Sequence, residues 1–158
     1  MSLSYSVSFV HRPIGEGNFG IVFHGVLTHS DGEWEEVAVK LLKEVNDQGA
    51  EEEIQHELML MRDLVHENIV QIKGCHEILN EGMIAIVMEY VREGSLDNYL
   101  RTYKNRIKMP QLFLYAENIC EGMIYLSKRG IIHRDLAARN ILVANEEQVK
   151  ISDFGLAR

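Results

Sequence analysis

The chain has 158 residues, of which 46% are hydrophobic and 25% are charged, a balance typical of a globular protein with a sizeable core. Its net charge of −8 argues against a nucleic-acid partner, and no apolar run approaches the roughly 18 residues that a membrane-spanning helix needs. The N-terminus lacks the pattern of a secretory signal, and Cys75 and Cys120 lie in apolar segments without a disulfide framework. We therefore expect a cytoplasmic protein whose two reduced cysteines serve packing.

The first ninety residues have mostly strand-like patterns. Apolar runs at residues 21–27, 37–42, 69–75 and 83–89 are separated by turn-forming sequences, Asp31-Gly32 and residues 80–82. Together with a first strand before the glycine-rich turn, these runs predict five short strands in a small, mostly antiparallel sheet, with one helix between the third and the fourth.

That helix follows three acidic residues at positions 51–53, which suit the positive end of a helix dipole. At 100° per residue, one apolar face is formed by Ile54, Leu58, Met61, Leu64 and Val65. Glu57 falls inside the same arc. A carboxylate on a buried face is unfavourable unless it is paired, so Glu57 needs a cation or a set of hydrogen bonds.

Residues 94–130 are helix-like instead. Ser95 is a plausible N-cap for a short helix, and Met109-Pro110 opens a longer one. The longer helix carries an apolar stripe at i, i+4, i+7, i+11 and i+14, formed by Leu112, Ala116, Ile119, Met123 and Leu126.

Residues 15–22 fit the pattern G-x-G-x-x-G-x-V. Glycines allow backbone N–H groups to approach phosphate oxygens closely. A dinucleotide-binding fold would need a helix directly after the last glycine, whereas a β-type run follows here. A hairpin that merely needs glycines is the structural alternative.

Lys40 closes the strand at residues 37–42 and shares a face with Ala38. A lysine at this place is often only a solvated edge charge. Pairing of Lys40 with Glu57 would satisfy both residues at once.

The segment HRDLAARN and the later DFG indicate phosphoryl transfer. Asp135 could accept the proton of an attacking hydroxyl, while Asn140 and Asp153 supply hard oxygen ligands for Mg²⁺. Taken singly, His133 could be a core histidine and Asp153 a turn former; their common spacing favours the catalytic interpretation.

With these motifs in this order, residues 9–158 resemble the N-terminal part of a eukaryotic protein kinase domain. The resemblance implies an α+β fold, with a five-stranded antiparallel N-lobe, a helix C and an incomplete helical C-lobe. It implies an N-terminal extension at 1–8, an N-lobe at 9–88, a hinge at 89–94 and a partial C-lobe at 95–158.

The resemblance also implies ATP and Mg²⁺ as cofactors. Lys40 would hold the α- and β-phosphates, Glu57 would fix Lys40, Asp135 would be the base, and Asn140 and Asp153 would bind Mg²⁺. The implied ATP contacts are Ile14, Gly15, Glu16, Gly17, Asn18, Phe19, Gly20, Val22, Ala38, Lys40, Met88, Glu89, Tyr90, Val91 and Leu142.

The hydroxyl acceptor is indicated by the catalytic loop. Serine/threonine kinases usually carry a lysine two residues after the catalytic Asp, where this chain has Ala137, and the Ala-Ala-Arg-Asn form with Arg139 resembles tyrosine kinases. Residues 66–74, 88–90, 94–96 and 119–126 are similar to the Janus family, although the ending Leu-Ala-Arg is the commoner tyrosine-kinase form.

These resemblances imply a non-receptor tyrosine kinase that acts on tyrosine-containing protein substrates, with a membrane receptor tail as a further partner through other regions, at the inner face of the plasma membrane. The resemblance ends where the family's activation loop begins, so we expect these 158 residues alone to be inactive. The alternative is a non-catalytic ATP-binding or regulatory interaction fragment of a kinase, which would use the exposed helix stripe.

Overall fold

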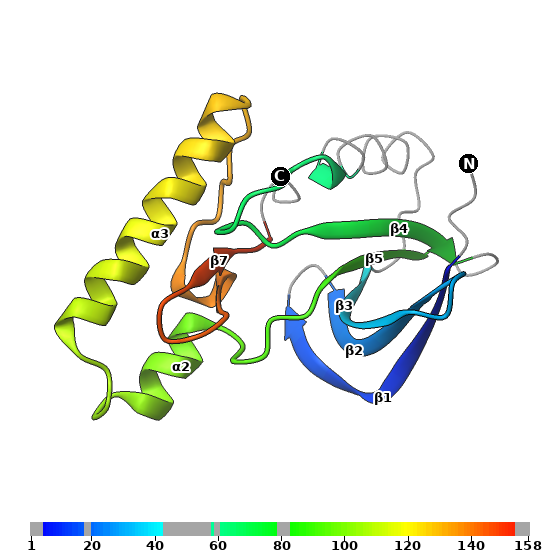
Figure 1. Ribbon diagram of the computed structural model, residues 1–158, viewed down its shortest axis with the longest axis horizontal. Helices are drawn as coiled ribbons and strands as arrows, with labels where there is room; N and C mark the ends of the chain where they lie inside the picture. The colour runs from blue at the N-terminus through cyan, green and yellow to red at the C-terminus, as the bar shows by residue number, and fades with distance from the viewer. Residues whose placement is uncertain (1–4, 18–19, 43–57, 59–60, 79–82, 154–158) are drawn as a thin grey trace. The chain divides into compact units, whose positions relative to one another are not determined.

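The computed structural model describes residues 5–17, 20–42, 58, 61–78 and 83–153. It divides into two compact units, Met1–Arg62 with Ile72–Tyr90, and Asp63–Gln71 with Val91–Arg158. Figure 1 shows the helices and strands in chain order.

The first unit is built on a five-stranded antiparallel sheet with the order β1-β2-β3-β5-β4. Its strands are β1 (Tyr5–Gly17), β2 (Gly20–His29), β3 (Trp34–Leu42), β4 (Ile72–Ile78) and β5 (Met83–Glu89). The predicted antiparallel lobe is confirmed. Pro13 lies in the edge strand β1 beside register shifts, where its missing N–H is tolerated.

The two β-hairpin predictions have different outcomes. The β2–β3 reversal lies at Asp31-Gly32 as predicted: Gly32 has φ +88° and donates its N–H to the His29 carbonyl at 3.0 Å, and the Asp31 carboxylate accepts from the N–H of Glu33. The other predicted turn, at residues 80–82, lies outside the described residues. Its flanking strands pair antiparallel from Ile78 and Met83 onward.

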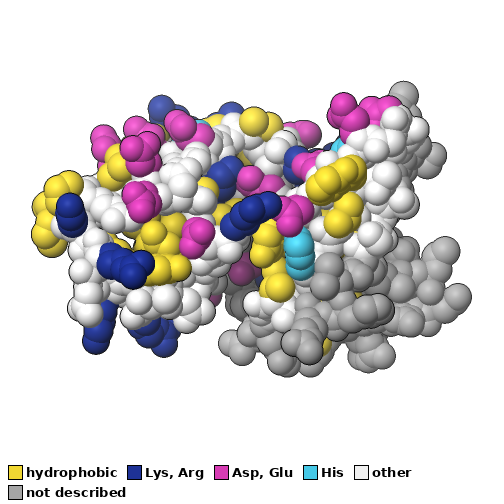
Figure 2. Space-filling view, turned by 60° about the horizontal axis from the view of Figure 1, so that its bottom comes forward, with side chains coloured by type: hydrophobic (Ala, Val, Ile, Leu, Met, Phe, Trp, Pro, Cys, Tyr) yellow, Lys and Arg dark blue, Asp and Glu magenta, His cyan; other side chains and the backbone are white. Residues whose placement is uncertain are grey.

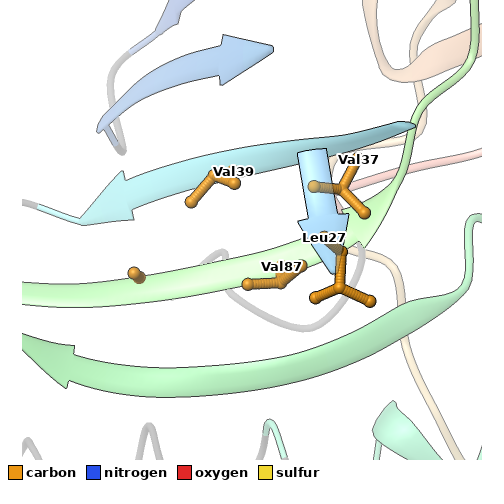
Figure 3. Close-up of a cluster of buried hydrophobic side chains, with 5 residues drawn as sticks. Leu27, Val37, Val39 and Val87 are labelled. Carbon is orange, nitrogen blue, oxygen red and sulfur yellow. The ribbon is translucent and has the colours of Figure 1, made fainter. Parts of the chain in front are cut away.

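Alternation along the strands gives this sheet two different faces. One face carries a core of five buried side chains from β2, β3 and β5, shown in Figure 3: Leu27, Val37, Val39, Ala85 and Val87. Burying side chains of this kind stabilises the fold by about 1.5–3 kcal/mol each. The opposite face carries Val22, Ala38 and Lys40, which alternate with the core positions.

The second unit contains two helices and a small sheet. Helix α2 (Leu96–Tyr103) and helix α3 (Met109–Lys128) precede a 3₁₀ turn, η1 (Ala138–Asn140), which leads into the antiparallel pair β6 (Ile141–Val143) and β7 (Val149–Ile151). The sequence did not predict β6 and β7, because three-residue strands are too short to show a period. Ser95 does precede α2, but its hydroxyl donates to the Asp97 carboxylate at 2.6 Å rather than capping the helix, and this bond lowers the pKa of Asp97.

A short segment from earlier in the chain lies beside β7. The N–H of Ile151 donates to the Asn68 carbonyl at 2.8 Å, and the N–H of Val70 donates to the Ile151 carbonyl at 2.9 Å. The buried Asn68 side chain donates to the Val149 carbonyl at 3.0 Å. The strand predicted at residues 69–75 therefore begins too early: β4 starts at Ile72, and the residues before it pair with β7.

Helix α3 packs on β7 through a different row from the predicted stripe. Its buried residues are Tyr115, Gly122 and Leu126, of which only Leu126 belongs to that stripe. A Cβ on Gly122 would lie 2.9 Å from the Asn68 carbonyl oxygen, so the helix approaches its neighbours more closely than a larger residue allows. The packing interpretation of Cys120 is wrong, since this residue is exposed.

The surface face drawn in Figure 2 carries hydrophobic side chains among acidic and basic ones. The exposed hydrophobic residues include Phe113 and Ile124 of α3. In the described ranges, no helix has the length and apolar character that a membrane crossing requires. The helix predicted around residue 57 falls mostly outside these ranges. Leu58, Met61 and Leu64 are described and are buried as expected, whereas Val65 is 68% exposed, so its predicted place on the buried face is wrong.

Candidate functional site

The glycine-rich segment forms the junction of β1 and β2. Gly17 pairs with Gly20, and β2 continues as a strand to His29, so no helix follows the last glycine. This geometry excludes the dinucleotide-type loop. Ile14, Gly15 and Glu16 lie on β1, while Asn18 and Phe19 are outside the described residues.

Gly20 is required for steric reasons. Its φ is +147°, and an added Cβ would lie 2.0 Å from the backbone oxygen of Leu41. Every other residue has a Cβ, so only glycine lets β2 return against β3 at this point.

Cross-strand pairing brings several predicted ATP-contact residues together. Val22 of β2 lies opposite Lys40 of β3, and Ala38 of β3 lies opposite Met88 of β5. Directly paired residues project from the same face, so these four side chains share the face opposite the hydrophobic core.

Lys40 is only 5% exposed, which argues against the interpretation as a solvated edge charge. Its predicted partner, Glu57, lies outside the described residues. The Lys40–Glu57 ion pair therefore stays a prediction.

The β3–β5 ladder ends with the pair Val37 and Glu89, and Tyr90 is the next residue. The Tyr90 ring stacks on the imidazole of His24, with ring centroids 4.3 Å apart and planes inclined by 29°. This contact joins residues far apart along the chain, so their spacing in the sequence does not predict it.

In the second unit, Val91 is buried and its carbonyl accepts from the N–H of Gly94. Leu142 lies in β6 opposite Lys150 and forms a bridge with Ser95. Leu142 thus lies in a strand, whereas Val91 lies outside the regular elements at the start of a turn.

The catalytic-loop residues come together around one carboxylate. Arg139 donates from its guanidinium to Oδ1 of Asp135, and Asn140 donates from Nδ2 to Oδ2 at 2.9 Å and to the Asp135 carbonyl at 2.8 Å. The 3₁₀ turn Ala138–Asn140 makes this possible, because it places residues four and five positions after Asp135 back beside it. The Asp135 carboxylate is therefore fixed at both of its oxygens.

His133 and Ser152 anchor the catalytic loop by hydrogen bonds. The buried His133 ring accepts from the Asp135 N–H at Nδ1 and pairs with the Ser152 carbonyl at Nε2, over 2.9 Å. These partners assign the tautomer with the proton on Nε2. His133 is thus a hydrogen-bonded core histidine that also positions the backbone of Asp135.

Ser152 links the loop to Asp153. Its N–H and its hydroxyl both donate to the Asn140 carbonyl, at 2.8 and 2.9 Å. Ser152 is a further residue of the site that belongs to none of the sequence motifs; the only signal for it in the sequence is a serine directly after the apolar run of β7. Its two bonds join the backbone that carries Asn140 to the backbone that carries Asp153.

Asn140 and Asp153 are the predicted magnesium ligands. Both printed side-chain bonds of Asn140 use its nitrogen, and its amide oxygen is the atom that a cation would need. Carboxamide and carboxylate oxygens suit Mg²⁺, which usually takes one or two protein ligands and completes its shell with phosphates and water. Accordingly, the described residues contain no cluster of three or more His, Cys, Asp or Glu side chains that could hold a metal by themselves.

Two backbone positions, one in the catalytic loop and one after β7, are unusual. Arg134 has φ +65° and Asp153 has φ +57°, in the left-handed region that non-glycine residues rarely adopt. Such conformations cost on the order of 1–3 kcal/mol and are found most often at functional sites.

Comparison with known proteins identifies the family. A family model described as protein tyrosine and serine/threonine kinase matches residues 9–158. The chain is also 46% identical over 151 residues to the tyrosine-protein kinase JAK1 of Danio rerio, an alignment that covers 93% of this chain and 13% of that protein. The chain thus corresponds to a small part of that relative's length. It belongs to the protein tyrosine and serine/threonine kinase family, and its kinase domain resembles those of the Janus kinases.

Proposed function

We propose that this chain forms the ATP-binding and phosphoryl-transfer part of a protein tyrosine kinase, which moves the γ-phosphate of ATP to tyrosine hydroxyls of protein substrates. The observation that carries the proposal is the fixed Asp135 carboxylate, held by Arg139 and Asn140 on a loop that His133 supports. Positioning and electrostatic stabilisation supply most of the catalysis in phosphoryl transfer, so a fixed base suits this reaction.

Asp135 would act as the base. Its two side-chain hydrogen bonds use only part of the roughly four acceptor sites of a carboxylate. A substrate hydroxyl can therefore still donate to it. As the hydroxyl oxygen bonds to the γ-phosphorus, its proton passes to Asp135, the bond from the γ-phosphorus to the β-phosphate oxygen breaks, and ADP leaves.

The sheet of the first unit would bind the nucleotide. Lys40 would contact the α- and β-phosphates, the glycine-rich segment would approach the phosphates through backbone N–H groups, and Val22 and Ala38 would contact the adenine. The burial of Lys40 on the same face of the sheet as Val22 and Ala38 supports this role. The backbone of Glu89, Tyr90 and Val91 would hydrogen-bond the purine, with Leu142 on its other face and Met88 as the gatekeeper.

Asn140 and Asp153 would hold Mg²⁺, which neutralises phosphate charge during transfer. The chain's own contribution is to keep both ligands on one hydrogen-bonded backbone through Ser152. Glu57 would fix Lys40 by an ion pair.

Arg139 supports specificity for tyrosine, because its guanidinium lies at the Asp135 carboxylate where a substrate phenol would dock. We further propose cytoplasmic protein substrates that contain tyrosine, and a receptor's cytoplasmic tail at the plasma membrane as a partner of the whole protein.

Nucleotide binding can be tested by thermal unfolding with and without Mg-ATP. At a ligand concentration of about 100 times Kd, binding adds about 2.7 kcal/mol of stability, which raises Tm by roughly 5–10 °C. Lys40→Met should lose most of this rise. If wild-type and Lys40→Met respond identically, the proposed nucleotide site is wrong.

Transfer can be tested with a tyrosine peptide and a matched serine peptide. A longer kinase that contains this chain should label the tyrosine peptide only, and Asp135→Asn in it should lose this labelling while it keeps the Mg-ATP stabilisation. Retained turnover in Asp135→Asn would refute the base assignment. The 158 residues alone should bind Mg-ATP through Lys40 but label neither peptide, and robust labelling by them would contradict the expected inactivity. A longer kinase that binds Mg-ATP but labels neither peptide would match the non-catalytic alternative.

A further inference from the structure

We infer that His24 positions the backbone at the end of β5, and thereby sets the affinity for the adenine base, by stacking against Tyr90 while Glu36 holds the imidazole at its Nε2 edge. The inference rests on the proposed nucleotide site. It assigns a role to His24 and Glu36, which the kinase motifs leave unused, and to the side chain of Tyr90.

Register places His24 on the nucleotide face of the sheet. His24 lies opposite Ala38, and Ala38 lies opposite Met88. His24 is also two residues beyond Val22 on the same strand, so both side chains project from the same face. The imidazole thus lies in the row of residues that leads from β2 across β3 to the end of β5.

His24 contacts Tyr90 at the point where the main-chain pairing of β3 with β5 ends. Glu89 is the last residue of β5 with a partner on β3, and Tyr90 follows it directly. The 4.3 Å ring stack therefore ties the first residue beyond the ladder back to β2. Since the adenine site is proposed on the backbone of residues 89–91, a change in this stack would move the groups that bind the base.

Glu36 holds the imidazole of His24 in place. It precedes Ala38 by two residues on β3, which places it diagonally across from His24 on the same face. The His24 Nε2 and a Glu36 carboxylate oxygen are 3.2 Å apart, and both side chains are less than one third exposed. Nε2 is buried and has no aligned hydrogen-bond acceptor among the described atoms, so Glu36 restrains the imidazole by close packing at this edge.

The test measures Kd by calorimetry for two magnesium-bound probes, ATP and inorganic tripolyphosphate. A stack of this kind corresponds to about a two- to tenfold change in affinity. His24→Ala should weaken ATP binding by this factor and leave tripolyphosphate binding unchanged, because tripolyphosphate has no base to meet the backbone after β5. His24→Phe keeps a ring and should restore ATP binding to within about twofold of the wild type.

Tyr90→Leu removes the other ring while keeping apolar bulk, and it supplies the same test if His24→Ala fails to fold. Its ATP-specific loss should equal that of His24→Ala, and the double variant should lose no more. His29→Ala is the matched control: this histidine lies on the same strand with its own carboxylate partner, Glu35 at 3.3 Å, and should change neither Kd.

Two results would overturn the inference while leaving the nucleotide site intact. One is unchanged ATP affinity in folded His24→Ala or Tyr90→Leu; the other is an equal loss for ATP and tripolyphosphate, which would indicate a general structural defect. If the wild-type chain binds neither probe, the proposed nucleotide site is wrong and this inference falls with it.

Discussion

Replacing Gly20 by alanine should destabilise the sheet at the point where the glycine-rich segment returns to it. The new Cβ would lie 2.0 Å from the Leu41 oxygen and 2.9 Å from the Leu41 carbonyl carbon. Both are backbone atoms of β3, which cannot swing aside as the end of a flexible side chain can. The start of β2 must therefore separate from β3 or leave its φ of +147°.

The size of the effect follows from two contributions. An unfavourable backbone conformation costs about 1–3 kcal/mol, and forcing an extra methyl into a packed position costs about 1–3 kcal/mol. We therefore expect Gly20→Ala to lower the free energy of unfolding by roughly 2–5 kcal/mol. For a protein of this size that corresponds to a fall in Tm of about 5–20 °C.

Two other glycines provide controls for each contribution. Gly32 has φ +88° with no atom within 4 Å of an added Cβ, so Gly32→Ala tests backbone strain alone and should cost about 1–2 kcal/mol. Gly15 has its nearest contact at 3.9 Å, so Gly15→Ala should be close to neutral. The assay is urea unfolding followed by circular dichroism. If Gly20→Ala is as stable as Gly32→Ala, the contact with β3 is not rigid and the steric reasoning fails.

Three further predictions concern other parts of the structure. Ser152→Ala removes one hydrogen bond to the catalytic loop and should lower the free energy of unfolding by about 1 kcal/mol in urea titration; no change would mean that the backbone bond suffices. Cys120 is exposed, whereas burial raises the pKa of the Cys75 thiol. Iodoacetamide should therefore alkylate Cys120 before Cys75, as measured by mass spectrometry of the labelled peptides. Equal rates of alkylation would contradict the burial of Cys75. Burial alone would raise the pKa of Glu35, but Lys73 and His29 bring it below its ordinary value of 4.5. The stability that this carboxylate contributes is present above pH 4.5 and is lost as the pH falls through the folded-state pKa. Glu35→Gln should therefore make the fall of Tm at acid pH less steep, and an unchanged Tm–pH profile would refute the coupling.

Sequence patterns predicted the strands of the first unit well where each strand pairs with one that is near it in the chain. The run at residues 83–89 is confirmed as β5 with the same bounds, and the turn at Asp31-Gly32 joins β2 to β3. The run at residues 69–75 was misplaced, because an apolar run does not reveal its partner. Ile69 forms its bridge with Ile151, which lies at the other end of the chain.

Helix α3 shows a different limit of periodicity. The helix has apolar residues on more than one side, so spacing alone could not select the row that becomes buried. Gly122 is a weak helix former, and a pattern search gives it no packing role. In the structure it is nevertheless the residue that lets the helix approach the Asn68 carbonyl.

The candidate site was predictable from the sequence where its residues are close neighbours along the chain. Asp135, Arg139 and Asn140 lie within six consecutive residues, so one tight turn brings them together, and their motif is recognisable from the sequence. The stack of His24 on Tyr90 depends on the register of three strands and could not be inferred from spacing. The predicted role of Glu57 lies outside the described residues.

The pairing of Asn68 and Val70 with β7 determines where this protein can be divided. The first unit is discontinuous in sequence, because residues 63–71 belong to the second unit while the residues before and after them belong to the first. A fragment that begins at Val91 would lack the main-chain partner of Ile151, and β7 would keep an unpaired edge. During synthesis, likewise, residues 63–71 are made well before residues 91–158, with which they form the second unit. The two units are therefore not separable modules, and neither can be excised by a single cut.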